Sequence, residues 1–282
     1  MKTLKIALVM LLVAATAVVF DSCQKAKLNR TTTSSADNSL AEAAFTDVYK
    51  VAVETADDES SNKANIYSFG NCANVTVDPA WPDTTFPKSV IVDFGSINCT
   101  CNDGKTRRGI ISFTMTGRYR TPGTVITLTT DNYYVEDYKV EGLKTITNQG
   151  RNNAGNLSYS IAVQDGKITT PDAEEIKWES SRVREWIEGE GTTLVSDGVA
   201  GVLDDVYSIT GSGSGVNRDG RNFTVTITSA LIVKVGCRWI TQGVLEIAPE
   251  DLKVRKLNYG DGNCDNEATV EIGNKTYNIM LR

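Results

Sequence analysis

The sequence of 282 residues contains no histidine. Ser-His-Asp and Cys-His catalysis both use an imidazole as the general base, so both are excluded. Zinc and iron sites that depend on imidazole ligands are excluded for the same reason. The remaining chemistry is limited to carboxylates, lysine, tyrosine, cysteine or a metal bound through oxygen. Because no set of residues identifies such a reaction, we favour a protein that is not an enzyme.

The chain also lacks a basic excess, with 29 lysine and arginine residues against 35 aspartate and glutamate residues. Without residues 1–22 the balance is 27 against 34, which gives a net charge of −7. A nucleic-acid-binding surface needs clustered positive charge, so we expect no nucleic-acid partner. A chain of this length can bury a sizeable core in one or two domains.

The apolar run from Ile6 to Phe20 follows a short basic segment at the N-terminus. The run is shorter than the roughly 20 residues that a helix needs to cross a membrane. Residues 1–22 are therefore typical of a secretory signal peptide. Cys23, placed where cleavage should occur, resembles the lipobox cysteine of bacterial lipoproteins. We predict that Cys23 is acylated and attaches the protein to a membrane, with ordinary signal-peptide cleavage as the alternative.

Residues 23–38 are small and polar without periodicity, which indicates a flexible tether. Lys25, Lys27 and Arg30 lie just after Cys23, and a basic start suits a segment near anionic headgroups. Surface-exported lipoproteins of the Bacteroidota tend to carry acidic residues at this place. The predicted location is the cell envelope, and a periplasm-facing protein is favoured over a surface-exposed one.

A helix is predicted over residues 39–58. Ser39 and Glu42 have the spacing of a capping box. Leu40, Ala44, Val48 and Val51 follow at helical intervals and would lie on one face, packed against a sheet.

Beyond residue 70 the apolar period changes to two. The alternation appears at 111–119, 157–163, 223–233 and 277–281, with serine and threonine on the opposite face of several of these segments. This pattern predicts antiparallel strands with one buried and one solvated face. Five Asp-Gly dipeptides, at 103, 165, 197, 219 and 261, are typical hairpin turns. We predict a mainly β protein, an antiparallel sandwich or extended meander over residues 70–282 with one short N-terminal helix.

Residues 170–190 fit two interpretations. Thr170 and Pro171 resemble the start of a helix that Gly189 would end. However, Ile176, Trp178 and the apolar residues that follow fit a helical face poorly. We therefore predict strands around a turn at Pro171-Asp172.

Four of the five cysteines after Cys23 form two equally spaced pairs, each 27 positions apart. In an exported protein the spacing predicts two disulfides, Cys72–Cys99 and Cys237–Cys264. Cys101 is left over, and the alternative pairs Cys72 with Cys101 and leaves Cys99 free.

The second cysteine of each pair ends a shared phrase: Asp or Asn, an aromatic residue, Gly, two free positions, Asn, Cys. The phrase occupies 93–99 and 258–264. Equal spacing and a shared phrase predict two related structural units, residues 72–115 and 237–282.

The phrase at 258–266, Asn-Tyr-Gly-Asp-Gly-Asn-Cys-Asp-Asn, also supports a family resemblance. Together with the segments at 107–109, 140–142, 184–189, 268–270 and 279–282, it is similar to a group of uncharacterised Bacteroidota lipoproteins with a YGDGxCDN-type C-terminal motif. The resemblance covers most of the chain. It implies an all-β envelope protein, and it supplies no catalytic residues.

A calcium site is one candidate at the second phrase. Oxygen-bearing side chains alternate there, at Asp261, Asn263, Asp265 and Glu267. The pattern lacks the glycine and the final glutamate of a full calcium loop, and a tight turn held by a disulfide explains the same residues. Apart from this candidate we expect no cofactor.

A glycan-binding site is the second candidate, on the strand that follows residue 175. Trp178, Arg184, Trp186 and Glu188 would share one face, with the tryptophans as a sugar-stacking platform. Alternating arginine and glutamate on a solvated strand face is the competing interpretation. Separately, Asp83-Thr84-Thr85 fits a short O-glycosylation pattern at Thr84.

The sequence therefore favours a lipid-anchored envelope protein that acts as a binding or structural module, with a glycan or another envelope protein as partner. The alternatives are a carboxylate-based glycan-active enzyme and an assembly subunit that pairs through its strand edges.

Overall fold

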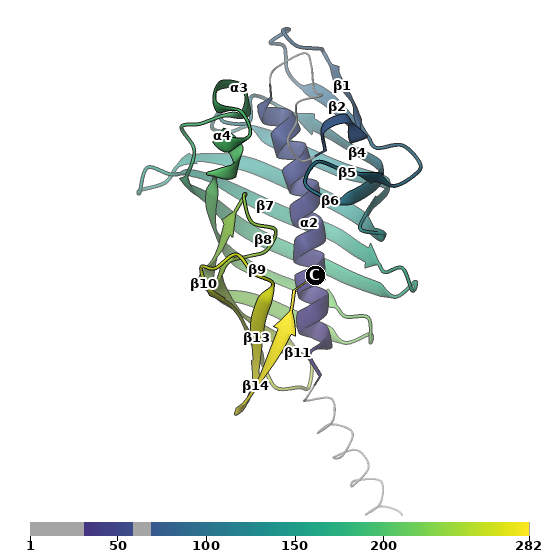
Figure 1. The fold of residues 1–282 in the computed structure, drawn as a ribbon, viewed down its shortest axis with the longest axis vertical. Helices are drawn as coiled ribbons and strands as arrows, with labels where there is room; N and C mark the ends of the chain where they lie inside the picture. Colours follow the sequence, from purple (N-terminus) through teal and green to yellow (C-terminus); the bar gives the residue numbers. More distant parts are fainter. Residues whose placement is uncertain (1–30, 59–68, 282) are drawn as a thin grey trace, which may run out of the picture.

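In the computed structural model, which describes residues 31–58 and 69–281, an antiparallel sheet curls around a long helix, α2 (Thr33–Asp57) (Figure 1). The predicted signal peptide and Cys23 lie outside the described residues. Short helical segments are η2 (Gly70–Cys72), α3 (Leu194–Asp197) and α4 (Ala200–Leu203). The strands are β1 (Asn74–Asp78), β2 (Lys88–Asp93), β3 (Cys99–Thr100), β4 (Thr106–Met115), β5 (Val125–Val135), β6 (Tyr138–Arg151), β7 (Leu157–Thr169), β8 (Glu175–Glu188), β9 (Val206–Val216), β10 (Asn222–Lys234), β11 (Gln242–Pro249), β12 (Arg255–Asp261), β13 (Glu267–Ile272) and β14 (Lys275–Met280).

The sheet is an extended meander, one of the two architectures that the sequence predicts. Each strand from β4 to β14 pairs with its neighbours in the chain, β2 joins β1 to β4, and the short β3 pairs with β4 alone. Tight turns make this order possible, because a two-stranded antiparallel connection needs few residues. One such turn is Asp219-Gly220 between β9 and β10. The mainly β prediction is confirmed.

Two local predictions had different outcomes. The segment after Pro171 is a strand, as predicted: β8 follows the turn and pairs with both β7 and β9. Asp165-Gly166 is not a hairpin turn, however, because both residues lie inside β7 at a shift of register. A side chain at Gly166 would come within 2.2 Å of the Trp178 carbonyl oxygen. The dipeptide therefore forms a bulge in β7, at which the backbones of β7 and β8 approach closely. Such a bulge bends the sheet.

Helix α2 starts six residues before the predicted position. Residues 33–38, predicted as tether, belong to the helix, and Ser39 lies in its interior rather than at its cap. The polar residues of this first turn have partners on the sheet. Asn217 donates a hydrogen bond to Ser34, and Arg218 forms an ion pair with Asp37 at 2.5 Å. A polar segment resembles a tether in sequence because partners about 180 residues away are not visible there.

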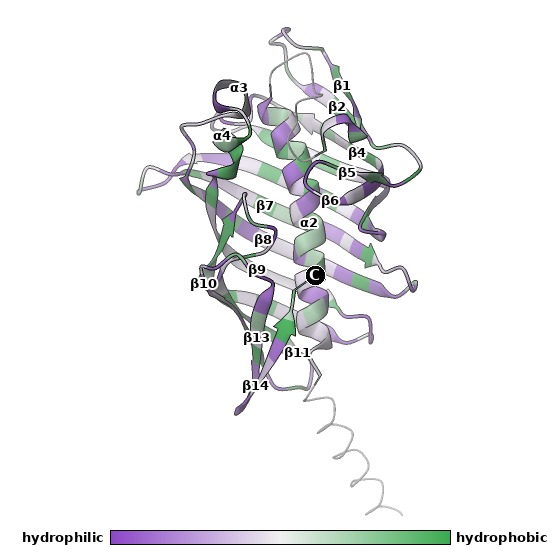
Figure 2. Cartoon of the chain, viewed as in Figure 1, coloured by the Kyte–Doolittle hydropathy of each residue, from purple (hydrophilic) through white to green (hydrophobic). Residues whose placement is uncertain are grey.

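The apolar face predicted for the helix is buried against the sheet. Ala44, Val48 and Val51 have exposed fractions of 4%, 1% and 0%. Phe45 stacks on Trp178 with 5.3 Å between ring centroids. Figure 1 shows α2 crossing the concave side of the sheet, and Figure 2 shows hydrophilic bands between the apolar ones along the helix. The core is therefore the layer between α2 and the inner face of the strands.

The two cysteine units lie at opposite ends of the strand order. Both predicted disulfides are present, Cys72–Cys99 and Cys237–Cys264, each with 5.7 Å between Cα atoms. Cys101 is a buried free thiol, which rules out its pairing with Cys72. Of the helices in the described ranges, none is long and apolar enough to cross a membrane.

Candidate functional site

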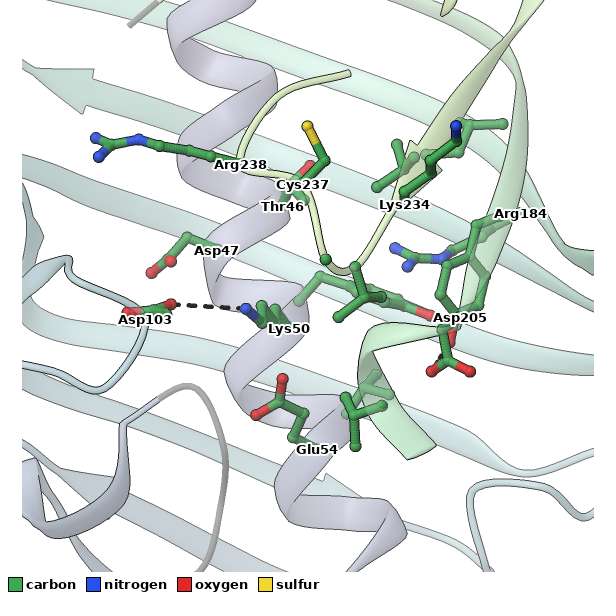
Figure 3. Close-up of a pocket in the computed structure, with 18 of the residues that line it drawn as sticks. Thr46, Asp47, Lys50, Glu54, Asp103, Arg184, Asp205, Lys234, Cys237 and Arg238 are labelled. Carbon is green, nitrogen blue, oxygen red and sulfur yellow. Dashed lines mark hydrogen bonds and ion pairs between the residues drawn. The ribbon is translucent and has the colours of Figure 1, made fainter. Parts of the chain in front are cut away.

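A cavity of about 360 Å³ lies between α2 and the part of the sheet that carries the second cysteine unit. Helix residues such as Tyr49 and Val53 form one wall, and β8, β9 and β10 form the opposite wall. The connection 235–241 between β10 and β11 and the segment around α4 complete it (Figure 3). The cavity exists because the helix packs closely on the middle of the sheet while the second unit curls toward it without filling the space.

Aromatic side chains make up much of the wall. Tyr49 and Tyr119 share a hydrogen bond of 2.8 Å between their hydroxyl groups. Trp186 lies against Tyr207 with ring centroids 5.3 Å apart. Tyr259 of the second unit closes another side. Aromatic rings offer a large apolar surface with a polar edge, which suits a ligand that combines both properties.

Arg184 of β8 is the cation of this wall. Its exposed fraction is 6%, and its guanidinium lies over the Tyr207 ring, 3.6 Å from the ring centroid, and over the Tyr49 ring at 4.3 Å. Within the described part of the chain it has no hydrogen-bond acceptor or ion-pair partner, and its Nε is a buried donor without an acceptor. Figure 3 shows the side chain extending from the sheet toward α2. Burial opposes its charge, but the surrounding tyrosines and Asp205 outweigh burial and raise the pKa of Arg184.

Positive charge exceeds negative charge around Arg184. Arg182, two residues earlier on the same face of β8, forms a buried ion pair with Glu42 at 2.8 Å. Lys144 is also buried, and its Nζ donates a hydrogen bond to the Phe45 carbonyl oxygen at 2.6 Å. Burial, together with repulsion from Arg184 and Arg182, lowers the pKa of Lys144 to about 7 although Glu42 opposes this.

Asp205 is the acid beside this group. It accepts hydrogen bonds from Trp186 Nε1 at 3.1 Å and from the Tyr207 hydroxyl at 3.2 Å. Burial nevertheless raises the pKa of Asp205 to about 7. Its carboxyl group is therefore partly protonated at neutral pH and does not provide a full counter-charge.

A second acid and base pair closes the neighbouring end of the cavity. Arg120 binds Asp57 of α2 through an ion pair of 2.7 Å, and its guanidinium lies 4.6 Å from the centre of a Trp186 ring. Because this arginine already has an acid partner, it orders the tryptophan wall rather than offering a free cation.

The structure separates the four residues of the predicted glycan site. They alternate as expected, but Trp178, Arg184 and Trp186 face the buried interior, with exposed fractions of 2%, 6% and 3%, while Glu188 is exposed. Trp178 donates a hydrogen bond to Asn38 and stacks on Phe45, so it is a core residue. Arg184 and Trp186 line the cavity. The alternative of a solvated face is wrong, because α2 covers it.

The predicted calcium residues form a local turn. The Asn263 amide donates a hydrogen bond to Asp261, and Asp265 accepts one from the Glu267 backbone. In the described ranges, no three or more His, Cys, Asp or Glu side chains are placed to hold a metal ion. This geometry matches the tight turn that competes with a calcium loop.

Thr84, the predicted O-glycosylation residue, is exposed in the loop between β1 and β2. The preceding Asp83 accepts a hydrogen bond from the Thr85 backbone at 2.6 Å, so the tripeptide is a tight turn at the surface.

Sequence reasoning missed Tyr49, Asp205 and Tyr207 as site residues. Each belongs to a separate part of the chain, and only the curvature of the sheet brings them together. One signal was available: two tryptophans and two arginines on the same face of β8 predict a buried face, because tryptophan is seldom left in water.

No protein-family model, curated protein or solved structure matches the chain. The cavity, its aromatic wall and the buried Arg184 are therefore the basis for assigning a function.

Proposed function

We propose that the protein is a lipid-anchored envelope protein that binds a small ligand in the cavity between α2 and the sheet. The observation that carries this proposal is the cavity itself. Its volume of about 360 Å³ falls within the range of roughly 300–1,000 Å³ that is typical of small-molecule sites. Its wall combines aromatic side chains, which are common in such sites, with many acidic and basic side chains. This composition suits a ligand that has both an apolar and a charged part.

The anchor rests on the sequence, from the signal peptide to Cys23. Since α2 begins at Thr33, ten residue steps separate the acylated cysteine from the folded part. At full extension they span at most roughly 35 Å, so the cavity would stay near the membrane surface. Replacing Cys23 with Ser should release the protein from the membrane fraction of cells. Unchanged fractionation would contradict the lipid anchor.

A variant that fills the cavity tests the binding function. Val233 of β10 lines the cavity, and a Val233→Trp substitution should occupy part of its volume. The matched control is Val183→Trp, since Val183 lies on the outer face of the sheet with an exposed fraction of 39%. Thermal denaturation with a panel of small amphipathic compounds should show ligand stabilisation in the wild type and in the control.

The same stabilisation should be lost in Val233→Trp. Equal ligand shifts in both variants would place binding elsewhere on the molecule. No shift with any compound in the wild type would remove the binding function.

The glycan-active enzyme is not carried forward. Its tryptophans are buried on one side of the sheet while its proposed carboxylate, Glu188, is exposed on the rim. Glu190, another acid of that segment, forms an ion pair with Arg151 at 2.6 Å. These residues do not surround a space in which a sugar could lie between two carboxylates.

A further inference from the structure

We propose that the ligand is an amphipathic monoanion whose carboxylate binds the Arg184 guanidinium while its apolar body lies along the aromatic wall. This inference rests on the proposed binding function and specifies the ligand class. It begins with the cost of burying an arginine. A guanidinium carries five N–H donors, and moving it from water into a protein costs several kcal/mol unless acceptors compensate.

The contacts of Arg184 do not provide those acceptors. The guanidinium lies over the rings of Tyr49 and Tyr207, and these cation–π contacts hold it in place. The ring faces attract the positive charge, but they leave the N–H donors in the plane of the guanidinium without acceptors. A carboxylate matches this geometry, because its two oxygens accept parallel hydrogen bonds from one edge of the planar group.

Of the other buried arginines, Arg107 and Arg182 bind acids, and Arg255 donates hydrogen bonds to backbone carbonyl oxygens. Arg107 binds Asp47 and Asp103 at 2.6 and 2.7 Å, and Arg182 binds Glu42 at 2.8 Å. Each of them has an acid from α2 or from its own neighbourhood. Arg184 occupies the same kind of position on the same inner face, yet it faces the cavity instead of an acid. An acid supplied by a ligand would complete the pattern.

The local charge favours an anion at this place. Arg184 and Arg182 repel Lys144, whose pKa of about 7 leaves it only partly charged at neutral pH, as is Asp205. Glu42 pairs with Arg182, so the excess positive charge here is that of Arg184. A ligand carboxylate would balance the excess. Electrostatic complementarity of this kind determines which ligands enter as much as how tightly they bind.

The acids of α2 disfavour a second negative charge on the ligand. Glu54 and Asp57 line the helix side of the cavity, whereas Lys234 and Arg238 line the side of β10 and the connection after it. A second anionic group directed toward α2 would therefore be repelled. The aromatic rings of Tyr49, Trp186 and Tyr207 lie next to the Arg184 site, so the part of the ligand beyond its carboxylate should be apolar.

Matched probes separate the charge from the apolar body. We would measure binding of 4-phenylbutyrate, its neutral amide 4-phenylbutanamide and the cation 4-phenylbutylamine to the full chain by calorimetry. Decanoate and decanamide would repeat the comparison with an aliphatic body. The acid should bind roughly tenfold to a hundredfold more tightly than the amide, and the amine should bind most weakly, because a charge-assisted hydrogen bond exists only for the acid.

Variants of Arg184 test its role directly. In Arg184→Met the ratio of acid to amide affinity should fall to about one, while the amide retains its wild-type affinity. Arg184→Lys should restore part of the preference, because lysine keeps the charge but not the two-pronged geometry. The wild-type comparison of acid with amide needs no variant, so the inference stays testable even if a variant does not fold.

The outcomes distinguish the two proposals. Equal affinities of acid and amide in the wild type would overturn the monoanion inference and leave the binding function in place. An acid preference that persists in Arg184→Met would overturn the assignment of Arg184. If neither member of either pair binds, both proposals fail.

Discussion

The two cysteine units build the same local structure at opposite ends of the sheet. In each unit an Asp or Asn side chain accepts a hydrogen bond from the backbone N–H of the glycine two residues later. The distance is 2.8 Å for Asp93 and 3.0 Å for Asn258. Both glycines have positive φ, and the aromatic residue between is buried in both units. Each phrase then leads to a cysteine whose disulfide spans 27 positions.

The units differ by five residues in the connection between the first cysteine and the strand residue that pairs with the start of the phrase. In the first unit Asn74, the strand partner of Asp93, lies two positions after Cys72. In the second, Val244, the partner of Asn258, lies seven positions after Cys237. The equal spacing of the cysteines persists because the first unit has a correspondingly longer connection between its two strands.

These five residues serve different purposes. In the first unit the long loop packs on itself, with Trp81 against Phe86 and the Lys88 ammonium bound to two loop carbonyl oxygens. In the second unit the extra residues, Arg238, Trp239 and Ile240 among them, line the cavity. The comparison teaches that the same motif can carry either a self-packed loop or the wall of a cavity. The outcome depends on whether the added residues lie between the two strands or before the first of them.

The largest effect should come from Arg107, the buried arginine of the first cysteine unit. Arg107→Met would leave Asp47 buried without its main partner, and breaking such a pair typically costs about 3–5 kcal/mol. Arg184→Met removes no acid partner, so its free energy of unfolding should stay within about 1 kcal/mol of the wild type. Urea denaturation of the two variants measures the difference. Equal losses would make Arg184 a structural residue.

Removing either disulfide should cost roughly 3–4 kcal/mol, since both close loops of the same length in the chain-entropy model. The double variants Cys72→Ser/Cys99→Ser and Cys237→Ser/Cys264→Ser should therefore lose similar stability. Ligand affinity should fall only in the second variant, because Cys237 lies in the cavity wall. Calorimetry at a temperature where both double variants remain folded measures their ligand affinities. Equal affinities would show that the second disulfide has no special role in the cavity.

A smaller effect should appear in the pH dependence of stability. Asp205 has a folded-state pKa of about 7, above its ordinary value of 3.8, so the folded state binds this proton more tightly than the unfolded state. The wild type should therefore lose stability as pH rises from about 4 to about 7. Asp205→Asn should reduce that loss by on the order of 2 kcal/mol, measured by denaturation across this range. An identical pH profile in the variant would show that Asp205 is not the group responsible.

The smallest effect should come from Arg238, which forms an ion pair of 3.9 Å with Glu136. Both side chains are well exposed, at 46% and 38%, and exposed pairs contribute little. Arg238→Ala should change the free energy of unfolding by less than about 0.5 kcal/mol. A loss above 1 kcal/mol would mean that the ion pair, rather than the disulfide and packing, holds this connection.

Some features of the fold could be predicted because they depend on neighbouring residues. Alternation with period two predicted β4, β7, β10 and β14, and the apolar pattern after Pro171 predicted β8. The cysteine spacing predicted both disulfides and left Cys101 over. The start of α2 could not be predicted, because its first turn depends on Asn217 and Arg218. The turn predicted at Asp165-Gly166 was wrong, because a turn and a bulge both favour a residue with positive φ.

The candidate site was predicted only in part. Arg184 and Trp186 were singled out from the sequence, but for a solvated surface rather than a cavity wall. The sequence by itself determined the mainly β class and the paired cysteines, since these follow from propensity and spacing along the chain. Two of the five predicted Asp-Gly hairpin turns were wrong: Asp165-Gly166 lies inside β7, and Asp197-Gly198 lies where α3 ends, before α4. Tertiary structure decided which charges are paired. Glu42 binds Arg182 across 140 positions, whereas Arg184 has no acid within ion-pair distance among residues 31–58 and 69–281. The curvature of the sheet fixes which strand positions lie opposite the helix and which lie opposite the cavity.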